Sequence, residues 1–247
     1  MGAVILCALP IVGLAWRAPW SSLFTQLGRP GVRTALWLSL VCSVAATALS
    51  IALGLPLAWI LARFEFPGRR VLRALAVLPM VLPPVVGGLA LLTVFGRRGM
   101  VGQLLFDWFG VTIPYTIAAA ILAEAFVAMP FFVVTAEAGL RSVDRRFEEA
   151  ARTLGASRRR TFLRVTVPLV RPSLIAGAVL CWARALGEFG ATITFAGNSP
   201  HTDTMPLQIF LTFQQDPGGA LVLSLVLIAV SLVVLIALRE RWLGSVR

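Results

Sequence analysis

The sequence predicts an all-α integral membrane protein with about six transmembrane helices. Of its 247 residues, 58% are hydrophobic, and the mean hydropathy is +0.88. Charged residues make up only 13%, whereas a soluble domain has about a quarter. The apolar residues also fall in blocks close to the roughly 20 residues that a helix needs to cross a bilayer. No separate soluble domain is recognisable, so residues 1–247 are expected to form one transmembrane domain.

Six apolar segments are predicted to span the membrane. They are Gly2–Trp16, Leu36–Leu61, Ala74–Val94, Tyr115–Val134, Val167–Phe195 and Leu221–Leu238. The first is short, because fifteen helical residues reach about 22 Å and the hydrocarbon core is about 30 Å thick. It lacks the basic start of a signal peptide. We expect a retained anchor that either continues as a helix past Arg17 or belongs to a chain with a different start.

The third segment carries prolines at Pro79, Pro83 and Pro84. Proline removes a backbone donor and clashes with the preceding turn, so this segment is expected to kink or break. Discontinuous helices often line the pathway of a transporter. Pro83 and Pro84 are therefore candidates for the pathway, and a kink that serves helix packing alone is the alternative.

All 22 basic residues are arginines, since the sequence contains no lysine. A P-loop needs its lysine on the nucleotide phosphates, and Schiff-base chemistry needs a lysine amine. The chain is therefore expected to bind no ATP by a P-loop. If transport is driven by ATP, another subunit must bind the ATP and magnesium.

The arginines lie mainly on one side of the predicted spans. Fifteen lie between the second and third spans, between the fourth and fifth, and after the sixth, whereas five lie on the opposite side. The positive-inside rule therefore places both termini and the two arginine-rich loops in the cytoplasm. This asymmetry also explains the net charge of +11, which indicates contact with membrane lipid rather than with nucleic acid.

The sequence offers little support for a metal or redox site. Cys7, Cys42 and Cys181 all fall in apolar segments and form no CxxC pair, so we interpret them as small buried hydrophobes. The single histidine, His201, is expected on the outer surface. We therefore predict no metal site, no catalytic residue and no cofactor on this chain.

The loop at about 141–166 is the most informative segment. Asp144–Leu154 has a helix-forming composition, Gly155 fits a C-terminal cap, and Ser157 can cap a second short helix. Small residues at Ala150 and Ala151 would let another protein approach closely. An ordinary basic loop on lipid headgroups is the alternative.

This loop resembles the EAA loop of bacterial ABC importer permeases. That pattern is EAA, three residues, Gly, nine residues, then Ile-x-Leu-Pro; here it reads Glu149-Ala150-Ala151, Gly155 and Val165-Thr166-Val167-Pro168, with Val for Ile and Val for Leu. The resemblance implies a type I importer fold in which this loop is a coupling helix, docked on a separate ATPase subunit. It implies that Glu149, Ala150, Ala151, Gly155 and Pro168 form the coupling element. It also implies a homodimer and an extracytoplasmic substrate-binding protein.

Charged residues inside the predicted spans are the second set of candidates. Arg184 and Glu188 lie four residues apart, on one face if the fifth span is a continuous helix, and Glu124 lies within the fourth span. Such residues are costly in a bilayer and should face the bundle or a water-filled path. They are expected either to form a structural ion pair or to contribute to a pathway, where Arg184 could meet an anion.

The run Gly187-Glu188-Phe189-Gly190-Ala191-Thr192, followed by Phe195-Ala196-Gly197-Asn198, is similar to the molybdate group of these permeases, as is Leu82–Gly88. The resemblance implies import of molybdate, or of tungstate, across the bacterial cytoplasmic membrane by alternating access. Sulfate or thiosulfate permeases are the alternative, since they tend to have Tyr at Phe189 and Ser at Ala191. An intramembrane enzyme would need a nucleophile with a base or clustered metal ligands, which the spans lack. A receptor or structural protein would leave the EAA loop without explanation.

Overall fold

The computed structural model describes residues 1–199 and 201–243, and in this part of the chain all regular secondary structure is helical. Four helices are long and apolar enough to cross a membrane, and two bent helix pairs bring the number of spans to six if each pair counts as one. The four long helices are α3 (Pro30–Arg63), α7 (Ile117–Ser142), α10 (Val167–Leu186) and α13 (Pro217–Leu243). Their positions confirm the second, fourth and sixth predicted spans; α3 and α13 are longer than predicted at both ends, and α7 only at its C-terminal end.

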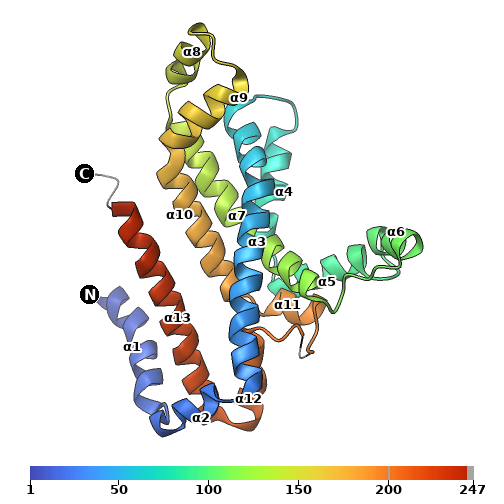
Figure 1. Ribbon diagram of the computed structural model, residues 1–247, viewed down its shortest axis with the longest axis vertical. Coiled ribbons are helices and arrows are strands. Elements are labelled where there is room, and N and C mark those ends of the chain that lie inside the picture. Colours follow the sequence, from blue (N-terminus) through green and yellow to red (C-terminus); the bar gives the residue numbers. More distant parts are fainter. Residues whose placement is uncertain (200, 244–247) are drawn as a thin grey trace.

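Helices α3, α7 and α10 form the centre of the bundle (Figure 1). Small residues allow them to approach closely, as is usual where helices associate in lipid. A methyl group added at Gly54 would lie 3.0 Å from Phe132, and one added at Gly177 would lie 3.3 Å from the same side chain. Phe132 is fully buried between them. Cys42 and Cys181 are buried, as predicted, but Cys7 is exposed.

The N-terminal segment bends after Arg17 instead of continuing as one straight helix. Helix α1 (Gly2–Arg17) ends at Arg17, and after a 3-10 turn η1 (Trp20–Ser22) the short helix α2 (Leu23–Leu27) leaves at 69°. The predicted continuation past Arg17 is therefore wrong. The reason is Pro19, which favours an extended residue before it, and Ala18 has φ −66° and ψ 131°.

A polar clamp attaches α2 to the start of α13 at the end of the bundle opposite α8. The Gln26 amide donates to Asp216 Oδ2 at 2.8 Å, and the Gly219 N–H donates to Asp216 Oδ1 at 2.9 Å. These two bonds, the Gly219 one foremost, hold the pKa of Asp216 below its usual value, and the charge of Arg29 acts in the same direction. A lowered pKa means that the clamp stabilises the fold at neutral pH.

We expect Asp216→Asn to lower the thermal unfolding midpoint at pH 7. The clamp needs the ionised carboxylate, so its contribution is complete above the ordinary value of 3.8 and is lost as the pH falls through the lowered folded-state pKa. The difference between wild type and variant should therefore shrink at pH 3, measured by unfolding in detergent at both pH values. An equal difference at both pH values would contradict a role for the charge.

The third predicted span is broken at its prolines, as predicted, whereas the break in the fifth corrects the prediction of one continuous helix. The third is α4 (Arg69–Val81) and α5 (Pro84–Phe95), bent by 118°. Leu82 and Pro83 are extended because each precedes a proline. The fifth is α10, ending at Leu186, and the short α11 (Gly190–Phe195).

Two further helices occupy segments for which the sequence predicted loops. They are α6 (Met100–Phe109), which extends sideways in Figure 1, and α12 (Met205–Gln215), which packs against α13 and α3. The N–H of Met205 donates to the buried Ser39 hydroxyl at 2.7 Å, which fixes the start of α12 on α3. His201, before α12, is exposed as predicted.

Candidate functional site

The loop at one end of the bundle has the predicted helix–glycine–helix form. Helix α8 (Arg145–Thr153) begins at Asp144, whose carboxylate accepts from the Arg146 N–H at 2.9 Å. Gly155 has φ +82°, a left-handed value that favours glycine. Helix α9 (Arg158–Thr161) begins at Ser157, whose hydroxyl accepts from the Arg160 N–H at 3.3 Å. The caps at Gly155 and Ser157 confirm the local fold that the sequence predicts, and Asp144 caps α8 instead of lying inside it.

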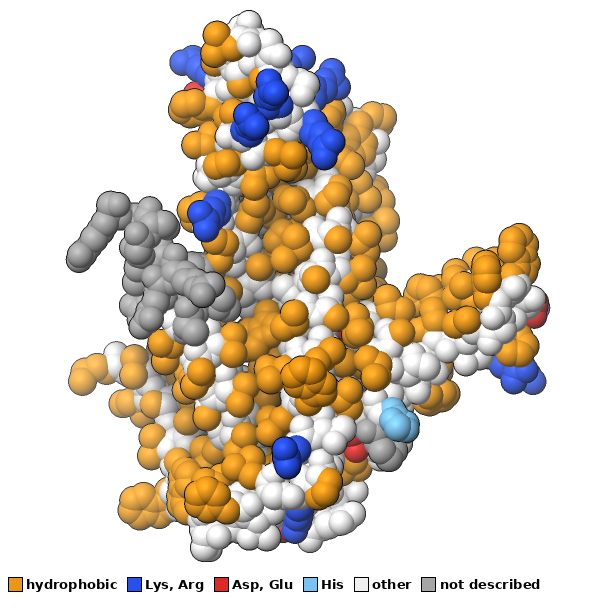
Figure 2. Space-filling model, in the orientation of Figure 1, with side chains coloured by type: hydrophobic (Ala, Val, Ile, Leu, Met, Phe, Trp, Pro, Cys, Tyr) orange, Lys and Arg blue, Asp and Glu red, His pale blue; other side chains and the backbone are white. Residues whose placement is uncertain are grey.

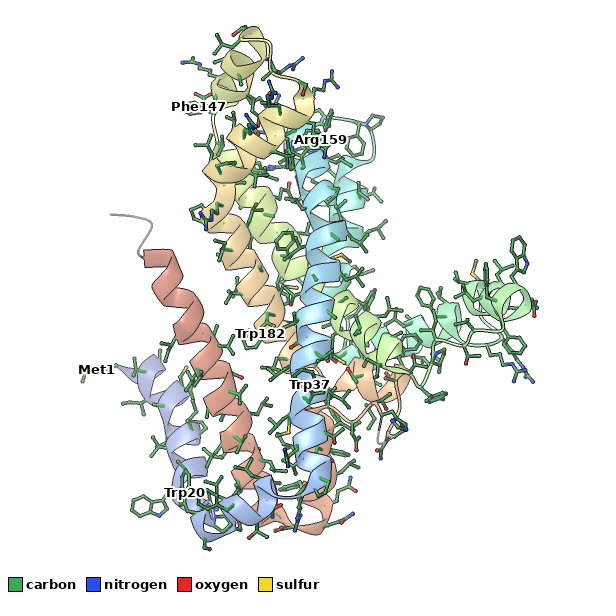
Figure 3. The ribbon with its side chains drawn as sticks, viewed as in Figure 1. Met1, Trp20, Trp37, Phe147, Arg159 and Trp182 are labelled. Carbon is green, nitrogen blue, oxygen red and sulfur yellow. The ribbon has the colours of Figure 1, made fainter. Side chains whose placement is uncertain are left out.

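The predicted docking residues lie on the accessible surface of this loop. Glu149, Ala150 and Gly155 are exposed, and Ala151 is partly buried. Pro168 is exposed in the first turn of α10, after the π-helical segment η2 (Phe162–Thr166). Exposed apolar side chains accompany them, among which Phe147 is labelled in Figure 3. The arrangement has the mixed apolar and charged surface that a protein partner can cover.

Glu148, which the sequence analysis did not single out, fixes α8 to the bundle. Its Oε1 lies 2.7 Å from Arg63 Nη2 at the end of α3, and it accepts from the Thr166 hydroxyl at 3.0 Å. Arg145 in turn donates to the Arg63 carbonyl oxygen at 3.0 Å. The residue that links α3, α8 and η2 is therefore the neighbour of the motif glutamate. Nothing in the sequence distinguishes Glu148 from its neighbour Glu149 in this respect.

A cavity of about 250 Å³ lies between α8, α9 and the end of α3. It is lined by the ion pair of Arg63 and Glu148, by further arginines and by Trp59. The ring of Trp59 makes edge contacts with Phe64 and Phe162 at centroid distances of 5.3 and 5.6 Å. Aromatic and ionic contacts therefore connect α8 to the end of α3 and to η2.

We expect Glu148→Gln and Glu149→Gln to have different effects. Glu148→Gln removes a charge-assisted bond to Arg63, which should lower the free energy of unfolding by about 1–3 kcal/mol. Glu149→Gln changes an exposed residue and should alter it by about 0.5 kcal/mol or less. Chemical denaturation in detergent measures both values. Equal losses would contradict the assignment of Glu148 as the residue that holds α8.

A second charged group ties α4 to α7 near the same end. Glu137 on α7 is 7% exposed and lies 2.5 Å from Arg73 on α4 and 2.8 Å from Arg141. Two arginines on one carboxylate compensate its burial. The sequence did not indicate this group, because Arg73 lies in one predicted loop whereas Glu137 and Arg141 lie in another.

The two half-helices α5 and α11 pack closely against each other. A Cβ added at Gly88 would lie 1.7 Å from the Thr194 hydroxyl and 2.7 Å from the Ala191 carbonyl oxygen. A Cβ added at Gly190 would lie 2.9 Å from the Cβ of Pro84. Pro84, a pathway candidate, therefore begins the half-helix that contacts α11, and Pro83 immediately precedes it.

Arg184 and Glu188 form an ion pair, in which Arg184 Nη2 lies 2.6 Å from Glu188 Oε2. They do not lie on one helix as predicted, because α10 ends at Leu186 and Glu188 lies in the break. The second Glu188 oxygen accepts from the Ala191 N–H at 2.8 Å and so caps α11. Glu188 is 1% exposed, whereas 27% of the Arg184 side chain is accessible. Glu188 therefore fixes the break, and the Arg184 side chain remains partly exposed.

Glu124 on α7 is the third charged residue that the sequence places inside a span. It is 1% exposed. Its Oε2 has no hydrogen-bond partner among the described residues. Within those residues no three His, Cys, Asp or Glu side chains form a group that could hold a metal ion. The sequence predicted that Arg184, Glu188 and Glu124 face the bundle; the structure buries Glu188 and Glu124 and pairs Arg184 with Glu188.

Comparisons with known proteins agree with this architecture. The family described as "Binding-protein-dependent transport system inner membrane component" matches residues 54–243. The "Molybdenum transport system permease protein ModB" of Mycobacterium tuberculosis is 42% identical over 242 residues, covering 98% of this chain and 91% of that protein. The "Sulfate transport system permease protein CysT" of Salmonella typhimurium is 37% identical, covering 95% and 86%.

Among solved structures, a bacterial ABC transporter that imports the acidic polysaccharide alginate has a TM-score of 0.73. Its identity is 18%, over 97% of this chain and 90% of that one. At this identity the likeness concerns the fold alone, which is that of an ABC importer permease.

Proposed function

Since this chain belongs to the family of binding-protein-dependent transport system inner membrane components, we propose that it is the permease of a molybdate importer. The observation that supports molybdate as the substrate is the 42% identity to a molybdenum transport permease over nearly the whole chain. Tungstate, an oxyanion of the same charge and shape, is expected to be a second substrate.

The working unit in this proposal is a homodimer with two ATPase subunits and one substrate-binding protein. The exposed surface of α8 and α9 would dock on the ATPase through Glu149, Ala150, Ala151, Gly155 and the nearby Pro168. ATP and magnesium would bind to the ATPase subunit, and this chain would hold no cofactor. Closure of the ATPases would move α8, and the link of Glu148 to Arg63 would carry the movement into the bundle.

The pathway is proposed to run past the two half-helices. Pro84 begins α5 directly after Pro83, and Glu188 caps α11, so both breaks lie beside the Arg184–Glu188 pair. Arg184 is the cation beside these breaks, with a partly exposed side chain, and an oxyanion needs a positive partner as it leaves water. Glu188 and Glu124 would keep that cation from holding the anion tightly. Alternating access would then expose this region to one side at a time.

The arginine distribution supports the orientation of the proposed permease. The connections α3–α4 and α7–α10 lie at the end of the bundle that bears α8, and the free ends of α1 and α13 point toward it (Figure 1). With the arginine-rich loops inside, both termini and the α8 surface are cytoplasmic in the bacterial cytoplasmic membrane. The opposite end, with α2 and α12, would receive the binding protein.

Sulfate or thiosulfate import is the second candidate, and the 37% identity to a sulfate permease supports it. The identity to the molybdenum permease is higher, and Phe189 and Ala191 agree with the molybdate group. Molybdate therefore takes precedence.

Uptake of labelled molybdate tests the proposal. Cells with the gene should accumulate molybdate, cells without it should not, and a large excess of sulfate should leave the uptake unchanged. Uptake abolished by sulfate would transfer the assignment to the sulfate class. Absence of gene-dependent uptake of either anion would contradict both substrates.

A further inference from the structure

The cavity between α8, α9 and the end of α3 has no role of its own in the proposed coupling. Four arginines line it, namely Arg63 from α3, Arg145 and Arg152 from α8, and Arg158 from α9. The acidic residues in its wall are Glu148 and Glu149, so positive charges exceed negative charges by two. Figure 2 shows arginine side chains gathered at this end of the bundle. A concave site with such a surplus of positive charge attracts anions.

Two of the four arginines have no acidic partner. Arg63 pairs with Glu148, and Arg145 donates to a backbone carbonyl oxygen. Arg152 and Arg158 form no ion pair within the part of the chain that the structure describes. Like charges that share one cavity repel each other, and an anion between them would turn this repulsion into attraction.

Two buried polar atoms in the cavity wall also lack a partner. Arg63 Nε and Thr161 Oγ1 are buried and form no hydrogen bond among the described residues. The Arg63 side chain is only 8% exposed and Thr161 only 4%, so bulk water does not compensate for the missing bonds. Such groups lower the stability of a fold unless something bonds to them. The oxygen atoms of an anion can accept from a guanidinium and a hydroxyl together.

The cavity lies where the apolar part of α3 ends. Trp59 is in its wall, and Arg63, four residues later, is the last residue of α3. Tryptophan is typical of the membrane–water interface, and arginine of its cytoplasmic side. Basic pockets between helices at this depth are the kind that binds anionic lipid headgroups. The position of the cavity therefore favours a lipid phosphate as the anion.

We propose that this cavity binds the phosphate group of an anionic lipid of the inner leaflet, with Arg63, Arg152, Arg158 and Thr161 as its donors. The phosphate would connect α3, α8 and α9 and compensate the surplus of positive charge. Free inorganic phosphate has the same chemistry but no acyl chains to concentrate it at the membrane surface. An acidic side chain of the ATPase subunit would have to reach past α8 to the side that faces the bundle.

A lipid held in this cavity would support α8 from the membrane side while the exposed residues of the loop contact the ATPase. The inference requires that the bundle spans a bilayer with α8 at its cytoplasmic end, and it does not depend on the transported substrate. Its test measures lipid binding and thermal unfolding. Failure of that test would leave molybdate uptake untouched, and a failure of uptake would leave lipid binding untouched.

Native mass spectrometry measures the binding of added phosphatidylglycerol to the full-length chain in complex with its ATPase subunits. Arg152→Gln with Arg158→Gln removes two charges from the cavity wall. The matched control, Arg146→Gln with Arg159→Gln, removes two charges from the same helices outside that wall; Arg159 is labelled in Figure 3. The unfolding midpoint of each variant in phosphatidylcholine alone shows that it folds.

We expect the cavity variant to bind the first phosphatidylglycerol about tenfold more weakly than the wild type, because charge-assisted hydrogen bonds are lost. The control should bind within about twofold of the wild type, since exposed charges contribute little. Equal weakening in both variants would show attraction to the net charge alone and would overturn the inference. Unchanged binding in the cavity variant would also overturn it.

Two further measurements identify the source of the anion. Phosphatidylglycerol should raise the unfolding midpoint of the full-length chain in phosphatidylcholine nanodiscs, whereas inorganic phosphate should not. An equal rise with inorganic phosphate would overturn the assignment to a lipid. Lipid binding by the chain alone that disappears once the ATPase subunits bind would overturn it in favour of an ATPase side chain.

Thr161→Val tests the site without a change of charge. It removes a buried hydroxyl that has no partner, so the unfolding midpoint in phosphatidylcholine alone should be unchanged or higher. Phosphatidylglycerol should nevertheless bind this variant several-fold more weakly than the wild type. Wild-type affinity for phosphatidylglycerol would contradict the cavity as the binding site.

Discussion

Gly88→Ala is expected to reduce molybdate uptake by about tenfold or more. The added methyl group would lie 1.7 Å from the Thr194 hydroxyl and 2.7 Å from a backbone oxygen of α11, so the helices must separate. Overpacking of this kind costs about 1–3 kcal/mol, and 1.4 kcal/mol is about tenfold in an equilibrium. The separation would disturb both half-helices at the proposed pathway. Uptake and the thermal unfolding midpoint in detergent measure the effect.

The matched control is Gly13→Ala, which makes the same change within α1. A Cβ at Gly13 would meet nothing within 4 Å, and glycine costs a helix about 0.5–1 kcal/mol relative to alanine. This variant should be as stable as the wild type or slightly more so, with unchanged uptake. If Gly88→Ala behaved like Gly13→Ala, then α5 and α11 would not be in close contact in the working protein.

The sequence predicts the spans and the coupling loop because their signals are local. A run of apolar residues defines α3, α7 and α13 without reference to the rest of the chain. The caps at Asp144, Gly155 and Ser157 depend on residues within one turn, and the structure has all three. Local patterns of this kind give the elements but not their angles.

The break after α10 shows where local signals fail. Pro83 and Pro84 indicated a break in the third span, but the fifth span has no proline between Leu186 and Gly190. That helix ends because the buried Glu188 bonds both Arg184 and the Ala191 N–H, a tertiary arrangement. In the same way, the partners of Glu148 lie 85 and 18 residues away in the sequence, so only the fold reveals its role.

Arg184→Gln is expected to cause the second large loss. It leaves the carboxylate of Glu188, which is 1% exposed, without its cation. Removing one partner of a buried pair costs about 3–5 kcal/mol. The variant should therefore give little folded protein, measured by the unfolding midpoint and by the yield after size-exclusion chromatography. A wild-type midpoint would show that the pair does not stabilise the fold.

The double variant Arg184→Gln with Glu188→Gln separates the two roles of this pair. It removes both charges. Replacing both partners of a buried pair lowers the stability far less than removing one of them, so the double variant should fold. The glutamine at 188 retains an oxygen that can accept from the Ala191 N–H. If Arg184 meets the oxyanion, as proposed, molybdate uptake by the refolded double variant stays low. Uptake that returns together with the unfolding midpoint would show instead that the pair serves helix packing, and the anion would need another cation along its path.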